Sequence, residues 1–417
     1  MKKRIPVING LRGIAIIGVI YHHIFYQITG PGWHSFTIGR FTMHPFAPLS
    51  NGMHGVMLFF VLSGFVLSLP YAEKRRRMET FNDVRMFYSR RLWRLLPLLS
   101  GAVVASVVMA GYPDVITSLA KFGDTMMKTL WPFPVTEPWF YPKDTWVLWS
   151  LRVEIWFSLL FPALVWVMHR YGITLTTLLV VAMNTAGRQA FWPDWTPGTM
   201  FFFDSFLMRL DAFVLGMAVA WIFTRKPATL RKPWIMPCGI VFVLAGFWLA
   251  NEDILAGLSI LYMPRMLLIA TGFMFITGSA LVRRSVLTRV LELSALQILG
   301  VMCYSLYVWH GILLLHINPR TDVHSAAVYA IALLFFSLLS YLTLEGGSFG
   351  RLVATLSVRQ VPTRVTASST MPELRKRAHV SAPPSTRIEE IPWNPSVGVV
   401  SAFQSEPQSK PSLVDAT

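Results

Sequence analysis

The sequence predicts an all-α, polytopic integral membrane protein with about ten transmembrane helices and both termini in the cytoplasm. Three observations support this: 54% of the 417 residues are hydrophobic, only 14% are charged, and long apolar stretches recur from the first residues to about position 345. A soluble domain carries about one quarter charged residues. A membrane-spanning helix needs about 20 predominantly apolar residues, and this chain offers such stretches repeatedly.

The basic residues of the expected loops set the orientation. Every second loop, beginning with Lys2-Lys3-Arg4, holds the arginines and lysines, whereas the loops between them hold few cations and acids such as Glu137. This alternation is typical of an even number of spans with both chain ends inside. The long loop 112–145, rich in proline and aromatic residues, is then expected outside. The expected helix cores are 7–28, 53–71, 92–111, 146–168, 171–187, 202–224, 234–250, 257–282, 295–316 and 325–345.

The net charge of +16 has the same explanation. The cations lie between apolar stretches, where they set topology and meet anionic lipid headgroups, and no basic patch studded with aromatic residues indicates nucleic-acid binding. Cys238 and Cys303 suggest neither a disulfide framework nor a metal site. Residues 351–417 are rich in serine, proline and threonine, so we expect a disordered cytoplasmic tail after a membrane domain of residues 1–350.

The first apolar stretch carries Arg12 and His23, which are eleven residues apart. At about 100° per residue, they share one helix face, separated by about 16 Å along the axis. Ionisable groups inside a spanning helix are costly and usually functional. The plainer alternative makes Arg12 an interfacial anchor and His23 a hydrogen-bonded packing residue.

Further polar side chains fall at membrane depth and predict two layers. An outer layer, suited to proton transfer, holds His23, Glu154, Arg209, Asp211 and His310. An inner layer, suited to binding phosphates from the cytoplasm, holds Arg12, Arg91 and Arg94. The plainer alternatives are a topology signal for the arginines of the third helix, a structural ion pair for Arg209 with Asp211, and a structural hydrogen bond for His310.

These residues lie in motifs that resemble those of acyltransferase family 3, whose members are multi-pass membrane proteins that O-acylate sugars. Arg12 and His23 match its arginine, ten residues, histidine pattern. The other matching segments are Gly55 to Phe65 with Ser63, Phe87 to Pro97 with the arginine pair, Trp149 to Phe157 with Glu154, Arg209 to Phe213, and Tyr304 to His310, followed by Glu345. The family often has aspartate at the positions of Asn9 and Met57, another polar residue at Ile155, and proline where Gly346-Gly347 stand.

The resemblance implies a bacterial plasma (inner) membrane enzyme. It would transfer an acyl group, acetyl by default, from cytoplasmic acyl-CoA as co-substrate to a hydroxyl of a carbohydrate or glycolipid, with no resident cofactor or metal. His23 would be general base or acyl carrier, oriented by Glu154 and assisted by Arg12. Arg91 and Arg94 would hold the CoA phosphates. The expected substrate-binding residues are Ser63, Arg209, Asp211, Tyr304 and His310.

Two other classes of function remain open. A transporter or flippase for a glycan or another polar substrate also places acids, arginines and histidines within the membrane. Against this reading, the sequence has no repeated pair of spans broken by glycine or proline, and the cations suited to phosphates lie on one side. A structural scaffold would leave the cost of burying Arg12, His23 and Glu154 unexplained.

Overall fold

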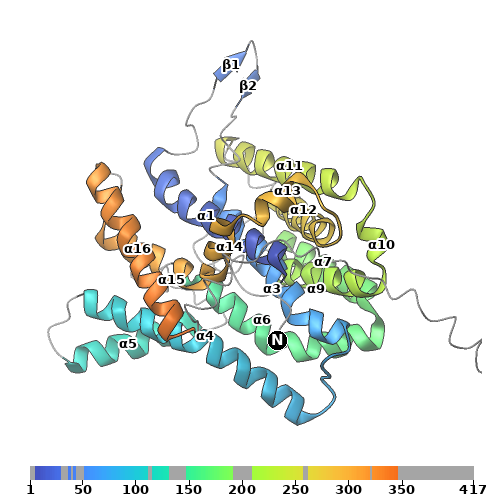
Figure 1. Cartoon of the computed structure of the whole chain (residues 1–417), viewed down its shortest axis with the longest axis horizontal. Helices are drawn as coiled ribbons and strands as arrows, with labels where there is room; N and C mark the ends of the chain where they lie inside the picture. Colours follow the sequence, from blue (N-terminus) through green and yellow to red (C-terminus); the bar gives the residue numbers. More distant parts are fainter. Residues whose placement is uncertain are drawn as a thin grey trace, which may run out of the picture. The chain divides into compact units, whose positions relative to one another are not determined.

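The computed structural model describes residues 5–29, 36–38, 41–43, 51–110, 115–130, 147–190, 209–256, 262–319 and 322–345. Almost all of these residues are helical (Figure 1). The first helices are α1 (Pro6–Thr29), α3 (Gly55–Ala72), α4 (Phe81–Met109), α5 (Val115–Leu130), α6 (Trp149–Tyr171) and α7 (Ile173–Ala190), with the short 3-10 helix η1 (Gly52–His54) before α3. The later helices are α9 (Leu210–Arg225), α10 (Pro227–Leu230), α11 (Ile235–Ala256), α12 (Tyr262–Val282), α13 (Val286–Leu291), α14 (Ser294–Val301), α15 (Cys303–His316) and α16 (Val323–Thr343).

The predicted helical class is confirmed, but the count of about ten spans is not. Within the described ranges, six helices are long and apolar enough to cross a membrane, and a seventh is obtained if α14 and α15 form one bent span. Apolarity also marks helices that are buried by other helices. Helix α9 is an example, because every residue from Leu210 to Trp221 is buried. The cytoplasmic position of the termini stays a prediction.

Two local features differ from the sequence analysis. A short antiparallel pair, β1 (Phe36–Ile38) with β2 (Phe41–Met43), is the only sheet among the described residues. Part of the expected loop 112–145 is helix α5, a stretch without proline between Pro113 and Pro132. The aromatic part of that loop and the predicted tail 351–417 lie outside the described residues.

Glycines bring α3 and α9 into backbone contact. A Cβ atom at Gly64 would lie 2.0 Å from the carbonyl oxygen of Phe213, and one at Gly216 would lie 2.0 Å from that of Val61. Only a residue without a side chain permits this approach. The contact fixes α3, which carries Ser63, against α9, which is buried from Leu210 to Trp221.

Helix α1 is held in the same way against α14. A Cβ atom at Gly300 would lie 1.8 Å from the carbonyl oxygen of Asn9. The chain then bends by 74° between α14 and α15, and α15 also packs against α1. Figure 1 shows α14 and α15 beside α1, with α16 packed on the other side of α15. The bend therefore delivers the Tyr304 to His310 segment to the helix that carries Arg12 and His23.

Candidate active site

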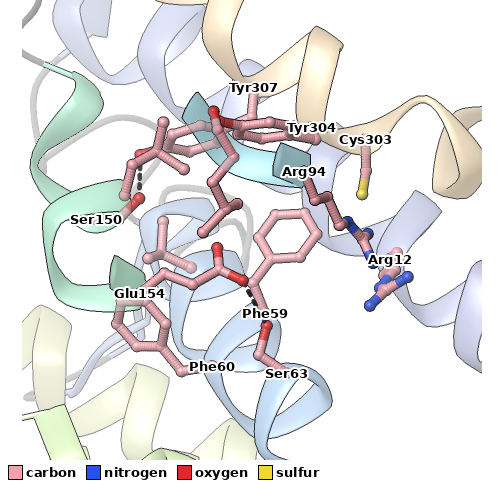
Figure 2. Close-up of a pocket in the computed structure, with 13 residues that line it drawn as sticks. Arg12, Phe59, Phe60, Ser63, Arg94, Ser150, Glu154, Cys303, Tyr304 and Tyr307 are labelled. Carbon is pink, nitrogen blue, oxygen red and sulfur yellow. Dashed lines mark hydrogen bonds between the residues drawn. The ribbon is translucent and has the colours of Figure 1, made fainter. Parts of the chain in front are cut away.

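A cavity lies among α1, α3, α4, α6 and α15 and has about 560 Å³ of empty space, including its open mouth (Figure 2). It is lined by Arg12, Val56, Phe59, Phe60, Ser63, Arg94, Leu95, Ser150, Leu151, Glu154, Cys303, Tyr304 and Tyr307. Five of these residues were predicted from the sequence as site residues: Arg12, Ser63, Arg94, Glu154 and Tyr304.

One part of the cavity wall is cationic. Figure 2 shows the guanidinium groups of Arg12 and Arg94 close to one another and to the Cys303 sulfur. In the part of the chain that the structure describes, neither arginine makes a hydrogen bond or an ion pair. Arg94 is exposed and Arg12 is half-buried. Two cations that make no hydrogen bond or ion pair with the described residues, and that line one open cavity, are suited to bind several anionic oxygens.

The last residue described, Glu345, lies near these cations. Its carboxylate accepts a hydrogen bond from Ser305 Oγ, and both Arg12 and Arg94 act on it electrostatically. Burial raises the pKa of Glu345 above its ordinary value. Glu345 follows the last of the sequence motifs, and no role was predicted for it.

Glu154 forms a compact polar group with residues of two other helices. Its carboxylate is paired with the buried guanidinium of Arg91 and accepts a hydrogen bond of 3.1 Å from Ser63 Oγ. Arg91 Nε donates to Ser158 Oγ at 3.0 Å, so both partners of the ion pair are anchored. Removing two charges from water is offset only when both are paired and hydrogen-bonded in this way.

The two predicted histidines contact each other. His23 Nδ1 and His310 Nε2 are 2.9 Å apart, and the rings are stacked. His310 is fully buried, and its Nδ1 lies 2.5 Å from the carbonyl oxygen of Tyr307.

The hydrogen bonds of this pair assign its tautomers. A carbonyl oxygen only accepts, so His310 Nδ1 carries a proton. In the neutral pair, His310 Nε2 must then accept the proton of His23 Nδ1. The lone pair of His23 is consequently on Nε2, the nitrogen that a general base or nucleophile uses.

Tyr307 connects the histidine pair to the cavity. His23 and His310 do not line the cavity, but Tyr307 does, and its ring lies 5.3 Å from that of His310. Its hydroxyl donates to the Val147 carbonyl oxygen and accepts from Ser150 Oγ at 2.8 Å. Phe59 packs edge-on against it. Tyr307 therefore lines the cationic cavity and also contacts His310.

The structure changes two parts of the predicted site. Glu154 was expected to orient His23, but its carboxylate bonds go to Arg91 and Ser63, and His23 contacts His310 instead. A carboxylate pairs more strongly with a guanidinium than with a neutral imidazole. The two predicted layers also meet, because Arg91 was assigned to the inner layer and Glu154 to the outer one.

Arg209 and Asp211 lie outside this cavity. The carboxylate of Asp211 pairs with Arg188 at 2.8 Å, both side chains being buried, and its backbone N–H donates to Asn184 Oδ1. Arg209 lines a different cavity. The two side chains thus have separate partners, as expected for residues two apart on a helix.

Several lining residues were absent from the predicted set, among them Cys303, Tyr307 and Phe59. Tyr307 was detectable, because it lies three residues after Tyr304 and three before His310, on the same helix face. The Phe59 side chain points into the cavity because of packing between helices, and the sequence carries no comparable pattern that predicts this direction. No cluster of three metal-ligating side chains occurs within the described ranges.

Comparisons with known proteins place the chain in a family. A family model described as an acyltransferase domain matches residues 5–345. The O-acetyltransferase OatA of Staphylococcus aureus is 26% identical over 341 residues, covering 75% of this chain and 51% of that protein. The peptidoglycan O-acetyltransferase OatA of Listeria monocytogenes is 24% identical over 348 residues, covering 77% and 51%.

This chain therefore spans about half the length of the curated relatives it matches. No solved structure gives a significant match. The family model, however, spans all of the described residues, and its match includes every predicted site residue. The chain belongs to acyltransferase family 3.

Proposed function

We propose that the chain is a membrane-embedded O-acyltransferase that moves an acetyl group from acetyl-CoA to a hydroxyl of a carbohydrate or glycolipid. The observation that carries the proposal is a pair of cations, Arg12 and Arg94, that make no hydrogen bond or ion pair with the described residues and line a cavity that Tyr307 connects to His310. Family membership and relatives named as O-acetyltransferases support it. A bacterial plasma membrane is the location that we propose.

The donor would enter at the cationic wall. Arg12 and Arg94 hold the CoA phosphates, with the N-terminus in the cytoplasm as the loop charges predict. The long pantetheine arm then extends along the cavity toward Phe59 and Tyr307. Arg91 is already paired with Glu154, so we assign Arg91 to holding the Glu154 carboxylate in place and leave phosphate binding to Arg12 and Arg94.

The chemical step would use the lone pair on His23 Nε2. In the general-base version, Nε2 takes the proton of the acceptor hydroxyl while that oxygen attacks the thioester carbonyl carbon. The carbon–sulfur bond breaks, and the thiolate of CoA leaves and receives the proton. In the nucleophilic version, Nε2 first carries the acetyl group and then passes it to the acceptor. Both versions need the tautomer that His310 fixes.

The test is release of free CoA thiol by the full chain in liposomes supplied with acetyl-CoA and a glycan fraction. We expect His23→Ala to abolish release, and Arg94→Ala to raise the KM for acetyl-CoA with little change in kcat. Arg90→Ala is the matched control, because Arg90 is an exposed cation one turn away on α4 that does not line the cavity. Equal donor dependence of Arg94→Ala and Arg90→Ala would contradict the assignment. Absence of release by the unmodified chain would favour the transporter alternative.

A further inference from the structure

A second cavity lies behind two wall residues of the first. It has about 280 Å³ of empty space, including its opening, and Val56 and Phe60 line both cavities. The other lining residues are Met53, His54, Met57, Trp149, Arg209 and Met266. They come from η1, α3, α6, α12 and the residue before α9.

His54 is the unexplained residue of this cavity. Its side chain is buried, with 5% exposure, yet neither ring nitrogen makes a hydrogen bond of ordinary geometry with the described residues; the backbone of Asn51 is the one hydrogen-bonding group that acts on the ring. The ring makes an edge contact with Phe247, which offers no acceptor. A buried polar group without a partner is costly and needs an explanation. Since His54 lines a cavity, the missing partner can be a ligand.

The chemistry of the cavity indicates the class of that ligand. Arg209 is buried, with its guanidinium over the Trp149 ring at 5.8 Å. The charges of Arg209 and Arg265 both act on the His54 ring. Among the described residues that line the cavity, no acid is present. A guanidinium and an imidazole at one apolar, aromatic cavity are suited to bind an anion with two oxygens.

We propose that this second cavity binds the carboxylate of an acidic sugar, with His54 and Arg209 as its donors. The proposal rests on the proposed function, because the carboxylate would belong to the acyl acceptor. Val56 and Phe60 separate the two cavities, so an acceptor held here by its acidic group lies beside the donor cavity. The acceptor would thus be selected for its charge as well as for its hydroxyl.

The test is thermal unfolding of the full chain in detergent with increasing sodium glucuronate, glucose or sodium acetate. We expect a saturable rise of Tm with glucuronate only. In His54→Phe and Arg209→Gln, the half-maximal glucuronate concentration should rise by about tenfold or more, since each change removes a donor to a charged group. Arg12→Gln is the matched control: it removes a cation from the other cavity and should keep the response.

Two results would overturn the proposal. One is a Tm that rises equally with glucuronate and with glucose, or that rises with neither. The other is an unchanged glucuronate response in both variants. His54→Phe should fold normally and keep the Tm of the ligand-free chain, because it removes two buried ring nitrogens. A changed glucuronate response in this variant is therefore not explained by misfolding. This binding test does not depend on thiol release, so failure of the acetyltransferase assay and failure of the carboxylate site are separate outcomes.

Discussion

The hydrogen bond between His23 and His310 yields a graded prediction. His310→Leu removes the acceptor of the His23 Nδ1 proton, so the imidazolium that forms during base catalysis loses one hydrogen bond. A hydrogen bond to a charged group contributes about 1.5–3 kcal/mol, which corresponds to a decrease in kcat of about 10- to 150-fold. The KM for acetyl-CoA should be unchanged, because His310 does not line the donor cavity.

A conservative variant separates positioning from packing. His310→Gln keeps an amide oxygen near the position of Nε2 and should recover part of the lost kcat, whereas His310→Leu should not. The double variant His23→Ala/His310→Leu should be no slower than His23→Ala alone, because both residues act through one proton. The assay is thiol release at saturating acetyl-CoA, with Tm measured for each variant. Full kcat in His310→Leu, or equal loss in Leu and Gln variants, would refute the reasoning.

Three further predictions follow from individual contacts. Asp211→Ala removes the carboxylate that pairs with the buried Arg188 and should destabilise the chain by about 3–5 kcal/mol, seen as a lower Tm that Asp211→Ala/Arg188→Ala partly restores; an unchanged Tm would contradict a structural pair. In a Cys238→Ser background, acetyl-CoA should protect Cys303 from maleimide, because Cys303 lines the donor cavity; labelling at the same rate with and without acetyl-CoA would place the donor elsewhere. Gly64→Ala should prevent folding, measured as loss of a monodisperse detergent-solubilised species, because its Cβ would meet the Phe213 carbonyl oxygen at 2.0 Å.

Sequence periodicity predicted what lies on one helix face. The register of Arg12 with His23 on α1 and the motif around Tyr304 and His310 on α15 both led to residues that the structure brings together. Such patterns depend only on the geometry of a single helix. This is why the family motifs and the helical class were recoverable without a structure.

Partners between helices were not recoverable in the same way. Which carboxylate meets which cation depends on helix packing, and so the Glu154 to Arg91 pair replaced the expected contact with His23. Depth counted along separate helices did not predict this pair either, because it placed the two partners in different layers. The predicted count of about ten spans is not confirmed by the described residues for a related reason: α9 is apolar and buried, and apolarity alone does not say whether lipid or another helix covers a helix.

The buried and half-buried charges of this chain divide into two groups with different physical explanations. Arg91 with Glu154 and Arg188 with Asp211 are paired within the protein, and pairing offsets the cost of removing charge from water. Arg12 has no such partner among the described residues, although it lies in a helix long enough to span a membrane. A cation kept without a protein partner beside an open cavity is explained if the counter-ion arrives with the ligand. The buried ring of His54 in the second cavity, which makes no hydrogen bond of ordinary geometry with the described residues, is explained in the same way. We therefore propose one physical role for both cavities: the donor phosphates would supply the counter-charge for Arg12 and Arg94 in one, and the acceptor carboxylate would accept from His54 in the other.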